Sequence, residues 1–139
     1  MRFKEESGIL FVRLFAGEDF FEGLELACKG SECATAIVVS AVGMLSDFEL
    51  GYFRKKGDYA KQFFKKPHEL VALNGLILRD AKGYNFHLHA ALSNEKKQLR
   101  GGHLFSAKVK ITAEIVLLKS AIPLHRELEE ETGLMGLKL

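Results

Sequence analysis

Two segments in the second half of the chain alternate between apolar and other residues, and this pattern limits the folds open to it. Between Tyr84 and Ser93 apolar side chains stand two residues apart, and the same spacing recurs from Lys108 to Leu117. Side chains two apart on a β-strand share one face of the sheet. Each segment therefore predicts a strand with a buried face, made by Phe86, Leu88, Ala90 and Leu92 in the first strand and by Val109, Ile111, Ala113, Ile115 and Leu117 in the second.

Histidines occupy the other face of the first predicted strand, at positions 87 and 89. A hairpin through residues 94–100 would return the chain antiparallel and bring His103 alongside His87 and His89. Three imidazoles from two adjacent strands predict a metal site with an open fourth position, and zinc suits neutral imidazole ligands. Glu114, further along the chain, is a candidate to orient one of the ligands through a hydrogen bond. The alternative is three unrelated histidines on a polar face, with Glu114 turned to solvent.

The first part of the chain predicts a strand followed by a helix. Residues 8–15 form a mostly apolar run that is typical of a buried strand. Asp19, three residues before Glu22, resembles the start of a capping box. Gly30 is a plausible C-terminal stop for the helix. Between these signals, apolar residues at helical spacing predict one buried face, made by Phe20, Leu24, Ala27 and Cys28.

The remaining segments predict further strands. Residues 34–42 and 47–53 are interpreted as two strands, with a bend or bulge at Gly43 between them. Residues 60–64 and 68–78 follow, and the pair Asn74-Gly75 indicates either a turn or a bulge inside one long strand. After Pro123, residues 125–132 are charged and permit a solvated helix, and residues 134–139 are apolar enough for a last strand. We therefore expect an α+β fold in which residues 1–139 form a compact single domain, with a mostly antiparallel β-sheet and one main N-terminal helix.

Composition adds a few limits. The net charge is +2, which neither indicates nor opposes binding to nucleic acid. No apolar run approaches the roughly 18 residues of a membrane span, so we expect no membrane association. The charged N-terminus lacks the features of a secretion signal, so the cytoplasm is the expected location. Cys28 and Cys33 would lie roughly 140° apart on a helix, a poor arrangement for chelation or a disulfide, and we interpret them as small apolar residues in a reducing compartment.

Basic residues occur in short groups that fall mainly in predicted turns. In such turns solvated side chains are the common interpretation, but a set of basic turns also offers contacts to phosphates. No helix-turn-helix, zinc-finger, RNA-recognition or phosphate-binding glycine motif accompanies them. The candidate nucleic-acid-binding residues are Arg54, Lys55, Lys56, Lys65, Lys66, Lys96, Lys97 and Arg100.

With these residues in view, the chain resembles the PPC domain, the plants and prokaryotes conserved domain, over nearly its whole length. The resemblance rests on the order and spacing of five short motifs, each weak by itself. These are Arg13-Leu14-Phe15-Ala16-Gly17-Glu18-Asp19, Val42-Gly43-Met44-Leu45-Ser46, Leu50-Gly51-Tyr52-Phe53, His87-Leu88-His89 and Gly101-Gly102-His103-Leu104.

The resemblance implies an α/β unit with an antiparallel sheet that assembles as a homotrimer. It implies zinc at His87, His89 and His103, the positions that match the three-histidine pattern of prokaryotic members. It also implies a role as a DNA-binding protein in transcription regulation, because plant relatives bind A·T-rich DNA and stand-alone prokaryotic members are described as predicted DNA-binding proteins. The Arg-Gly-Arg-Pro hook with which the plant proteins read the minor groove is missing here.

Three functional hypotheses follow. The first is a trimeric, zinc-containing DNA-binding regulator. The second is a metal-dependent enzyme, a hydrolase or lyase acting on a small molecule, in which the open metal position activates water or polarises a carbonyl. The third is a small-ligand sensor or scaffold that holds an anionic ligand at a metal pocket between subunits. We favour the first over an enzyme, because the sequence offers no convincing general base beyond Glu114. A cupin is disfavoured because no second cupin motif is present.

Overall fold

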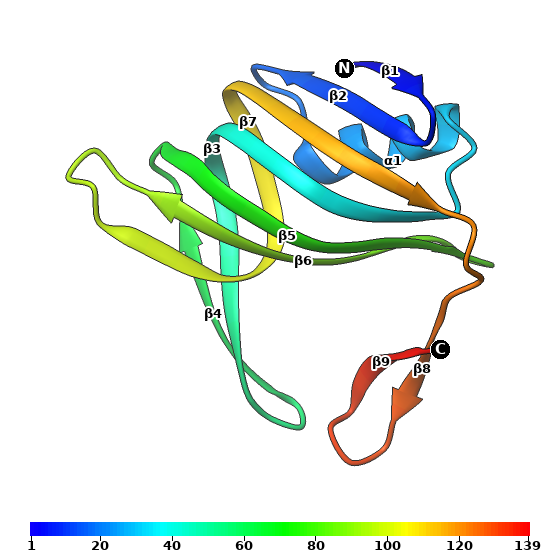
Figure 1. Cartoon of the computed structure of the whole chain (residues 1–139). Coiled ribbons are helices and arrows are strands. Elements are labelled where there is room, and N and C mark those ends of the chain that lie inside the picture. The colour runs from blue at the N-terminus through cyan, green and yellow to red at the C-terminus, as the bar shows by residue number, and fades with distance from the viewer.

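Most of the chain is extended, as the alternating segments predict. The computed structural model describes residues 1–139 and contains one helix and nine strands (Figure 1). In chain order the elements are β1 (Arg2–Glu6), β2 (Ile9–Phe15), α1 (Phe20–Gly30), β3 (Thr35–Lys55), β4 (Asp58–Phe64), β5 (His68–Asp80), β6 (Gly83–Ser93), β7 (Leu99–Ser120), β8 (His125–Glu129) and β9 (Leu134–Lys138).

Seven of the strands form one antiparallel sheet in the order β1-β2-β7-β6-β5-β3-β4. Strand β7 also pairs with β3. Because β7 pairs with β6, β6 with β5, and β5 with β3, this extra pairing closes β3, β5, β6 and β7 into a ring. The predicted α+β class with a mostly antiparallel sheet is confirmed, and the sheet is curved strongly enough to close on itself.

The long strand β3 replaces the two strands predicted from residues 34–42 and 47–53, so that separation is wrong. The predicted irregularity at Gly43 is confirmed, because the register between β3 and β7 shifts between Gly43 and Leu45. Gly43 has φ +150°, and a Cβ there would lie 2.2 Å from the Thr112 carbonyl oxygen. Glycine lets the two backbones approach where the strands bend.

The same shift explains one misplaced core residue. Gly43 pairs with Ala113, and Leu45 pairs with Val109. Two residue steps along β3 therefore face four along β7, so β7 carries two extra residues there. Ile111 lies in this stretch and is 60% exposed, although alternation alone assigns it to the core. The other predicted core residues of β7 are buried, as are three of those on β6, while Phe86 packs partly buried against the core.

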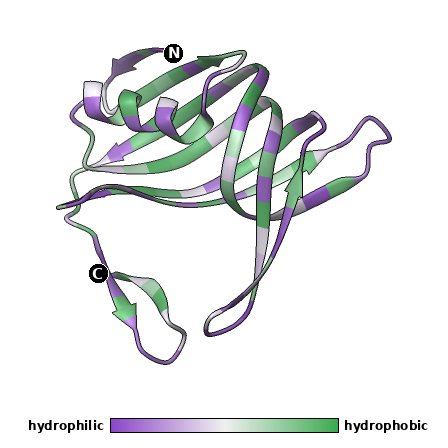
Figure 2. Ribbon diagram, turned by 180° about the vertical axis from the view of Figure 1, so that it is seen from behind, coloured by the Kyte–Doolittle hydropathy of each residue, from purple (hydrophilic) through white to green (hydrophobic).

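Helix α1 begins where the sequence predicts. The Asp19 carboxylate accepts hydrogen bonds from the backbone N–H groups of Phe21 and Glu22, at 2.9 and 3.0 Å. This satisfies two donors that the first helical turn leaves without partners. The predicted face is buried, the helix ends at Gly30 as expected, and it lies across one face of the sheet (Figures 1 and 2).

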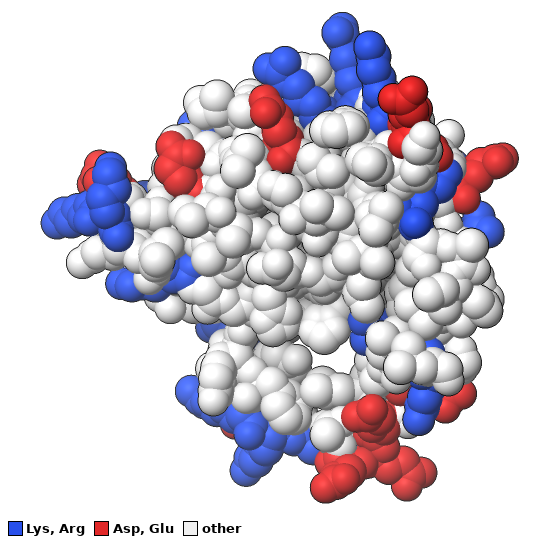
Figure 3. Space-filling model, in the orientation of Figure 1, with Lys and Arg blue, Asp and Glu red and all other residues white.

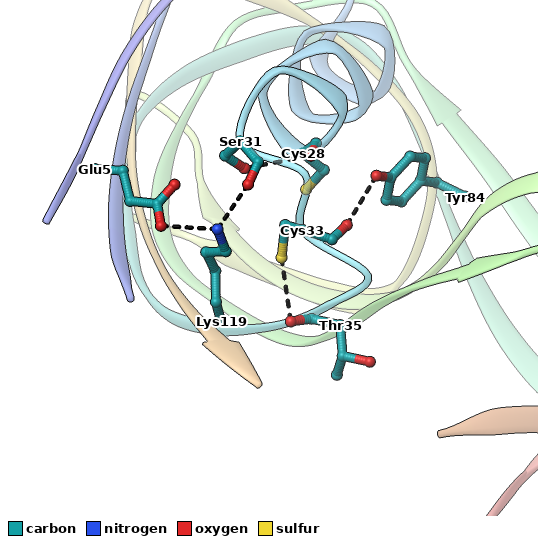
Figure 4. A network of polar contacts seen from close by, with 7 residues as sticks. All are labelled: Glu5, Cys28, Ser31, Cys33, Thr35, Tyr84 and Lys119. Carbon is teal, nitrogen blue, oxygen red and sulfur yellow. Dashed lines mark hydrogen bonds and ion pairs between the residues drawn. The ribbon is translucent and has the colours of Figure 1, made fainter. Parts of the chain in front are cut away.

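A polar network fastens the end of α1 to the sheet (Figure 4). The Lys119 ammonium donates to a Glu5 carboxylate oxygen at 2.7 Å and to the Ser31 carbonyl at 2.6 Å. The Tyr84 hydroxyl donates to the Cys33 carbonyl at 2.8 Å. Cys28 and Cys33 are free and buried. Cys33 lies after the last turn of α1, so the angle expected for two residues on one helix does not apply to this pair, and the Cys33 N–H donates to the Cys28 carbonyl at 2.8 Å.

The C-terminal residues form a separate two-stranded sheet of β8 and β9, which hangs below the main sheet in Figure 1. The helix considered for residues 125–132 is therefore wrong, whereas the last strand near residues 134–139 is confirmed. Arg126 pairs with Leu137 and Leu128 with Met135 in an antiparallel register. Gly133, with φ +71°, supplies the turn. No helix in the structure is long and apolar enough to cross a membrane.

Candidate metal centre

The sheet register brings the three predicted histidines together. His87 and His89 lie on one face of β6, and His89 is directly opposite His103 on the neighbouring strand β7. The hairpin of residues 94–98 that joins the strands is held by Asn94, whose carboxamide oxygen accepts from the backbone N–H groups of Lys96 and Gln98. The strand period and a short local turn thus place all three imidazoles on a common surface.

The geometry of the cluster fits a single metal ion. One ligand nitrogen from each histidine lies within 4.8 Å of the other two. The Nε2 atoms of His87 and His89 are 3.3 Å apart. Two nitrogens bound to a tetrahedral zinc at about 2.0 Å would be separated by roughly 3.3 Å, so this pair already has the required spacing. His103 needs only a small side-chain adjustment to complete the set.

Burial favours the uncharged form of two of the three histidines, His87 and His103. It lowers the pKa of His103 to about 4, with smaller contributions from His89 and His87. Burial also lowers the pKa of His87, and the nearby Arg126 guanidinium adds to this effect. Imidazole ligands bind a metal in their neutral form, so the lowered pKa values of His87 and His103 favour metal binding at pH 7.

Aromatic rings support His103 from the side. Its ring lies 4.5 Å from that of Phe105 and 6.2 Å from that of Tyr59. The Lys61 ammonium caps the Phe105 ring at 3.8 Å. Gly51, the register partner of His103, makes room for this arrangement, because a Cβ there would lie 2.3 Å from Phe105. These contacts restrict the rotamers of His103, as a preorganised ligand requires.

One functional candidate was missed by sequence reasoning. Arg126, on β8, places Nη2 3.3 Å from Nδ1 of His87 and donates from Nη1 to the Met135 carbonyl at 2.8 Å. A hollow of about 480 Å³ lies between the C-terminal hairpin and the histidines. Arg126 stands in an acidic run, 23 residues after His103. No spacing or motif in the sequence connects it to the cluster.

Glu114 lies in a different part of the sheet from the histidines. It pairs with Arg13 on β2 and with Val42 on β3, whereas His103 pairs with Gly51. It lines a separate hollow near the N-terminus. The structure therefore does not bring Glu114 to the cluster that it was expected to support.

The basic candidates lie in turns or at the strand ends beside them. Figure 3 shows Lys and Arg mainly around the rim of the face in view, with few over its centre. Lys66, Lys96 and Lys97 line one hollow of about 920 Å³, between the β4–β5 turn and the β6–β7 hairpin, together with Glu69 and Glu95. Two of the predicted groups thus converge there. The others lie apart: Arg54, Lys55 and Lys56 at the β3–β4 turn, Lys65 at the β4–β5 turn, and Arg100 beside Gly101 near β4.

The fold and this cluster define a class of protein: a small antiparallel β protein, closed by β3 and β7, with three convergent histidines open to a surface hollow. The chain belongs to the Plants and Prokaryotes Conserved (PCC) domain family, whose model matches residues 1–121. The sequence motifs indicated this same family, which is called the PPC domain in the sequence analysis above. The matched region contains all three histidines and ends before the β8–β9 hairpin.

Similar proteins extend this picture. The metal-containing protein from Archaeoglobus fulgidus is 28% identical, with a TM-score of 0.84 over 100% of this chain and 99% of that one. A candidate DNA-binding protein from Bacteroides thetaiotaomicron shares the fold, with a TM-score of 0.90 at 20% identity over 99% of this chain and 96% of that one. The bifunctional protein GlmU from a Synechococcus strain is 32% identical over 130 residues, 92% of this chain. The chain spans about a fifth, 20%, of the length of that relative.

Proposed function

We propose that this protein is a zinc-binding, homotrimeric member of its family that associates with DNA. The observation that carries the proposal is the convergence of His87, His89 and His103 on neighbouring strands, with two Nε2 atoms 3.3 Å apart. A similar protein of known structure is described as metal-containing. When bound, zinc would supply a Lewis-acidic centre with a position open toward the hollow.

Elemental analysis of the purified protein tests the metal centre. Wild-type protein is expected to carry close to one zinc per chain, and the variant His103→Ala to carry far less. His125→Ala is a matched control, because His125 is exposed on β8, where it pairs with Glu127 and stands outside the cluster. Equal zinc contents in the two variants would contradict the proposal.

The homotrimer is supported by an apolar face on three adjacent strands. On this face, Ile9 and Phe11 of β2 lie opposite Leu118 and Val116 of β7. Leu118 in turn lies opposite Ile37 of β3. Phe11 is 59% exposed, and its neighbours on this face are also partly exposed. A continuous apolar patch of this kind is typical of a surface that another chain covers.

Sedimentation equilibrium tests this assembly. The wild-type protein is expected to have three times the chain mass, and Phe11→Glu to dissociate it because a buried charge in the interface has no partner. Phe63→Glu is the control, since Phe63 is 58% exposed on β4, outside the apolar face. A monomeric wild type, or dissociation by both variants alike, would contradict the trimer.

DNA association is supported by the converging lysines on the hairpin turns. Lys66, Lys96 and Lys97 line one hollow, and trimerisation would present three copies of it. Each phosphate contact contributes a slope of about −0.9 to the dependence of log affinity on log salt concentration. A DNA duplex rich in A·T pairs is the first ligand to test, by analogy with relatives of the family.

A salt titration of binding measures this contribution. The double variant Lys96→Gln, Lys97→Gln should flatten the salt dependence, since a trimer would lose phosphate contacts from every subunit. Lys82→Gln is the control, because Lys82 is exposed in the β5–β6 turn, away from this hollow. Absence of binding at low salt, or a slope unchanged in the double variant, would refute this part of the proposal.

A further inference from the structure

Arg126 holds a positive charge for which the folded chain provides no carboxylate partner. No Asp or Glu oxygen lies within 4.0 Å of its guanidinium, although four of the next five residues are glutamates, Glu127, Glu129, Glu130 and Glu131. Its contacts are the Met135 carbonyl and Nδ1 of His87. The guanidinium is half-buried beside the hollow, so it is partly removed from water without a compensating anion.

Metal binding would remove one of these two contacts. The Nε2 atoms of His87 and His89 face each other, so Nε2 is the ligand atom of His87 that points into the cluster. A neutral imidazole that coordinates through Nε2 carries its proton on Nδ1. Guanidinium has donors only, and two donors cannot share a hydrogen bond. In the metal-loaded protein, the Nη2 group of Arg126 therefore needs an acceptor other than His87.

The hollow between the hairpin and the cluster has room for that acceptor. Its volume of about 480 Å³ falls in the range of small-molecule sites, about 300–1,000 Å³. Figure 3 shows the surface hollowed between the lower lobe, which holds β8 and β9, and the rest of the molecule. The walls combine a few polar groups, Tyr59, Asn85 and Arg126, with apolar side chains, which include Leu76, Phe86, Leu134 and Leu137.

We propose that this hollow binds a small organic carboxylate, with one oxygen at the open position of the metal and the carboxylate held by Arg126. The proposal rests on the zinc centre proposed above. A carboxylate matches the planar fork of guanidinium, and an apolar body would pack against Phe86 and Leu134. Glu129, which also lines the hollow, disfavours ligands with a second negative charge. The hairpin lies outside residues 1–121, so the family model does not include Arg126.

The test uses the full-length protein loaded with cobalt(II), whose visible spectrum reports changes in its ligands. Titration with benzoate should change the spectrum and saturate, whereas benzamide, which has the same shape without the charge, should leave it unchanged. Acetate should bind more weakly than benzoate because it lacks the apolar body. Arg126→Gln should weaken benzoate binding roughly 10- to 100-fold, the usual effect of losing a hydrogen bond to a charged group.

Two controls keep the outcomes distinct. Arg54→Gln removes the same charge at the β3–β4 turn, where Arg54 pairs with Asp58, and should bind benzoate as the wild type does. Arg126→Gln should still bind cobalt in the wild-type proportion, which shows that the cluster is intact. If cobalt binds and benzoate does not, or if Arg126→Gln binds benzoate as tightly as the wild type, this inference is wrong and the metal centre stands. If no cobalt binds to the wild type, the metal centre itself is refuted, and this inference with it.

Discussion

Gly75 couples the stability of the sheet to the position of a metal ligand, and replacing it by alanine tests that coupling. It lies inside β5, opposite Leu88 of β6, with φ +142°. A Cβ at this position would lie 1.9 Å from the carbonyl oxygen of His87 and 3.0 Å from Cα of Leu88. Both atoms belong to the backbone, so no side-chain rotation can relieve the clash. The strand that carries His87 and His89 would have to move.

Two free-energy costs add up to the destabilisation expected for Gly75→Ala. A non-glycine residue forced into a rare backbone conformation costs about 1–3 kcal/mol. Forcing extra volume into a packed region costs about 1–3 kcal/mol more. We therefore expect Gly75→Ala to lower the free energy of unfolding by about 4 kcal/mol, the sum of the central values of the two costs. It should also weaken zinc binding, because the displaced carbonyl belongs to a metal ligand.

Gly83→Ala is the matched control for the backbone conformation alone. Gly83 has φ +135°, close to that of Gly75, and is the first residue of β6, directly after the turn from β5. A Cβ there would meet no atom within 4 Å. This variant should therefore show only the cost of the unfavourable backbone conformation, about 1–2 kcal/mol at the end of a strand, and should bind zinc normally.

Urea unfolding of the metal-free variants, at one fixed protein concentration, measures both changes. Zinc affinity is measured separately by competition with a chelator. The reasoning is refuted if Gly75→Ala and Gly83→Ala destabilise the protein equally, since contact with the His87 backbone would then contribute nothing. It is also refuted if Gly75→Ala is strongly destabilised but binds zinc as tightly as the wild type.

Three further predictions concern other parts of the fold. Asp19→Ala should lower the free energy of unfolding by about 1 kcal/mol in urea, because the start of α1 loses its cap, and no loss would contradict that role. Lys119→Met should cost about 1 kcal/mol or more, because the Ser31 carbonyl and Glu5 both lose their donor. Metal-free protein should lose stability as pH falls from 6.5 to about 4, because in this window the unfolded chain protonates His103 and the folded protein does not. In His103→Gln, the free energy of unfolding in urea should differ less between pH 7 and pH 5 than it does in the wild type. A difference as large as that of the wild type would contradict the assignment to His103.

The sequence by itself determined the features that depend on neighbouring residues. The two-residue period of β6 decides that His87 and His89 share a face, and a short hairpin decides that His103 returns beside them. The capping aspartate and the apolar spacing after it decide where α1 begins and which face is buried. These signals are local, because strand period, helix period and caps act over a few residues.

The tertiary structure decided what depends on segments far apart in the chain. The extra pairing of β3 with β7 closes the sheet through several register shifts, and such shifts follow from the packing of both strands together. The same pairing carries Glu114 away from the histidines. The charged segment 125–129 is a strand only because β9 pairs with it, and this pairing delivers Arg126 to His87. Isolated periodicity cannot specify these contacts, since their energy arises only when both partners have been brought together.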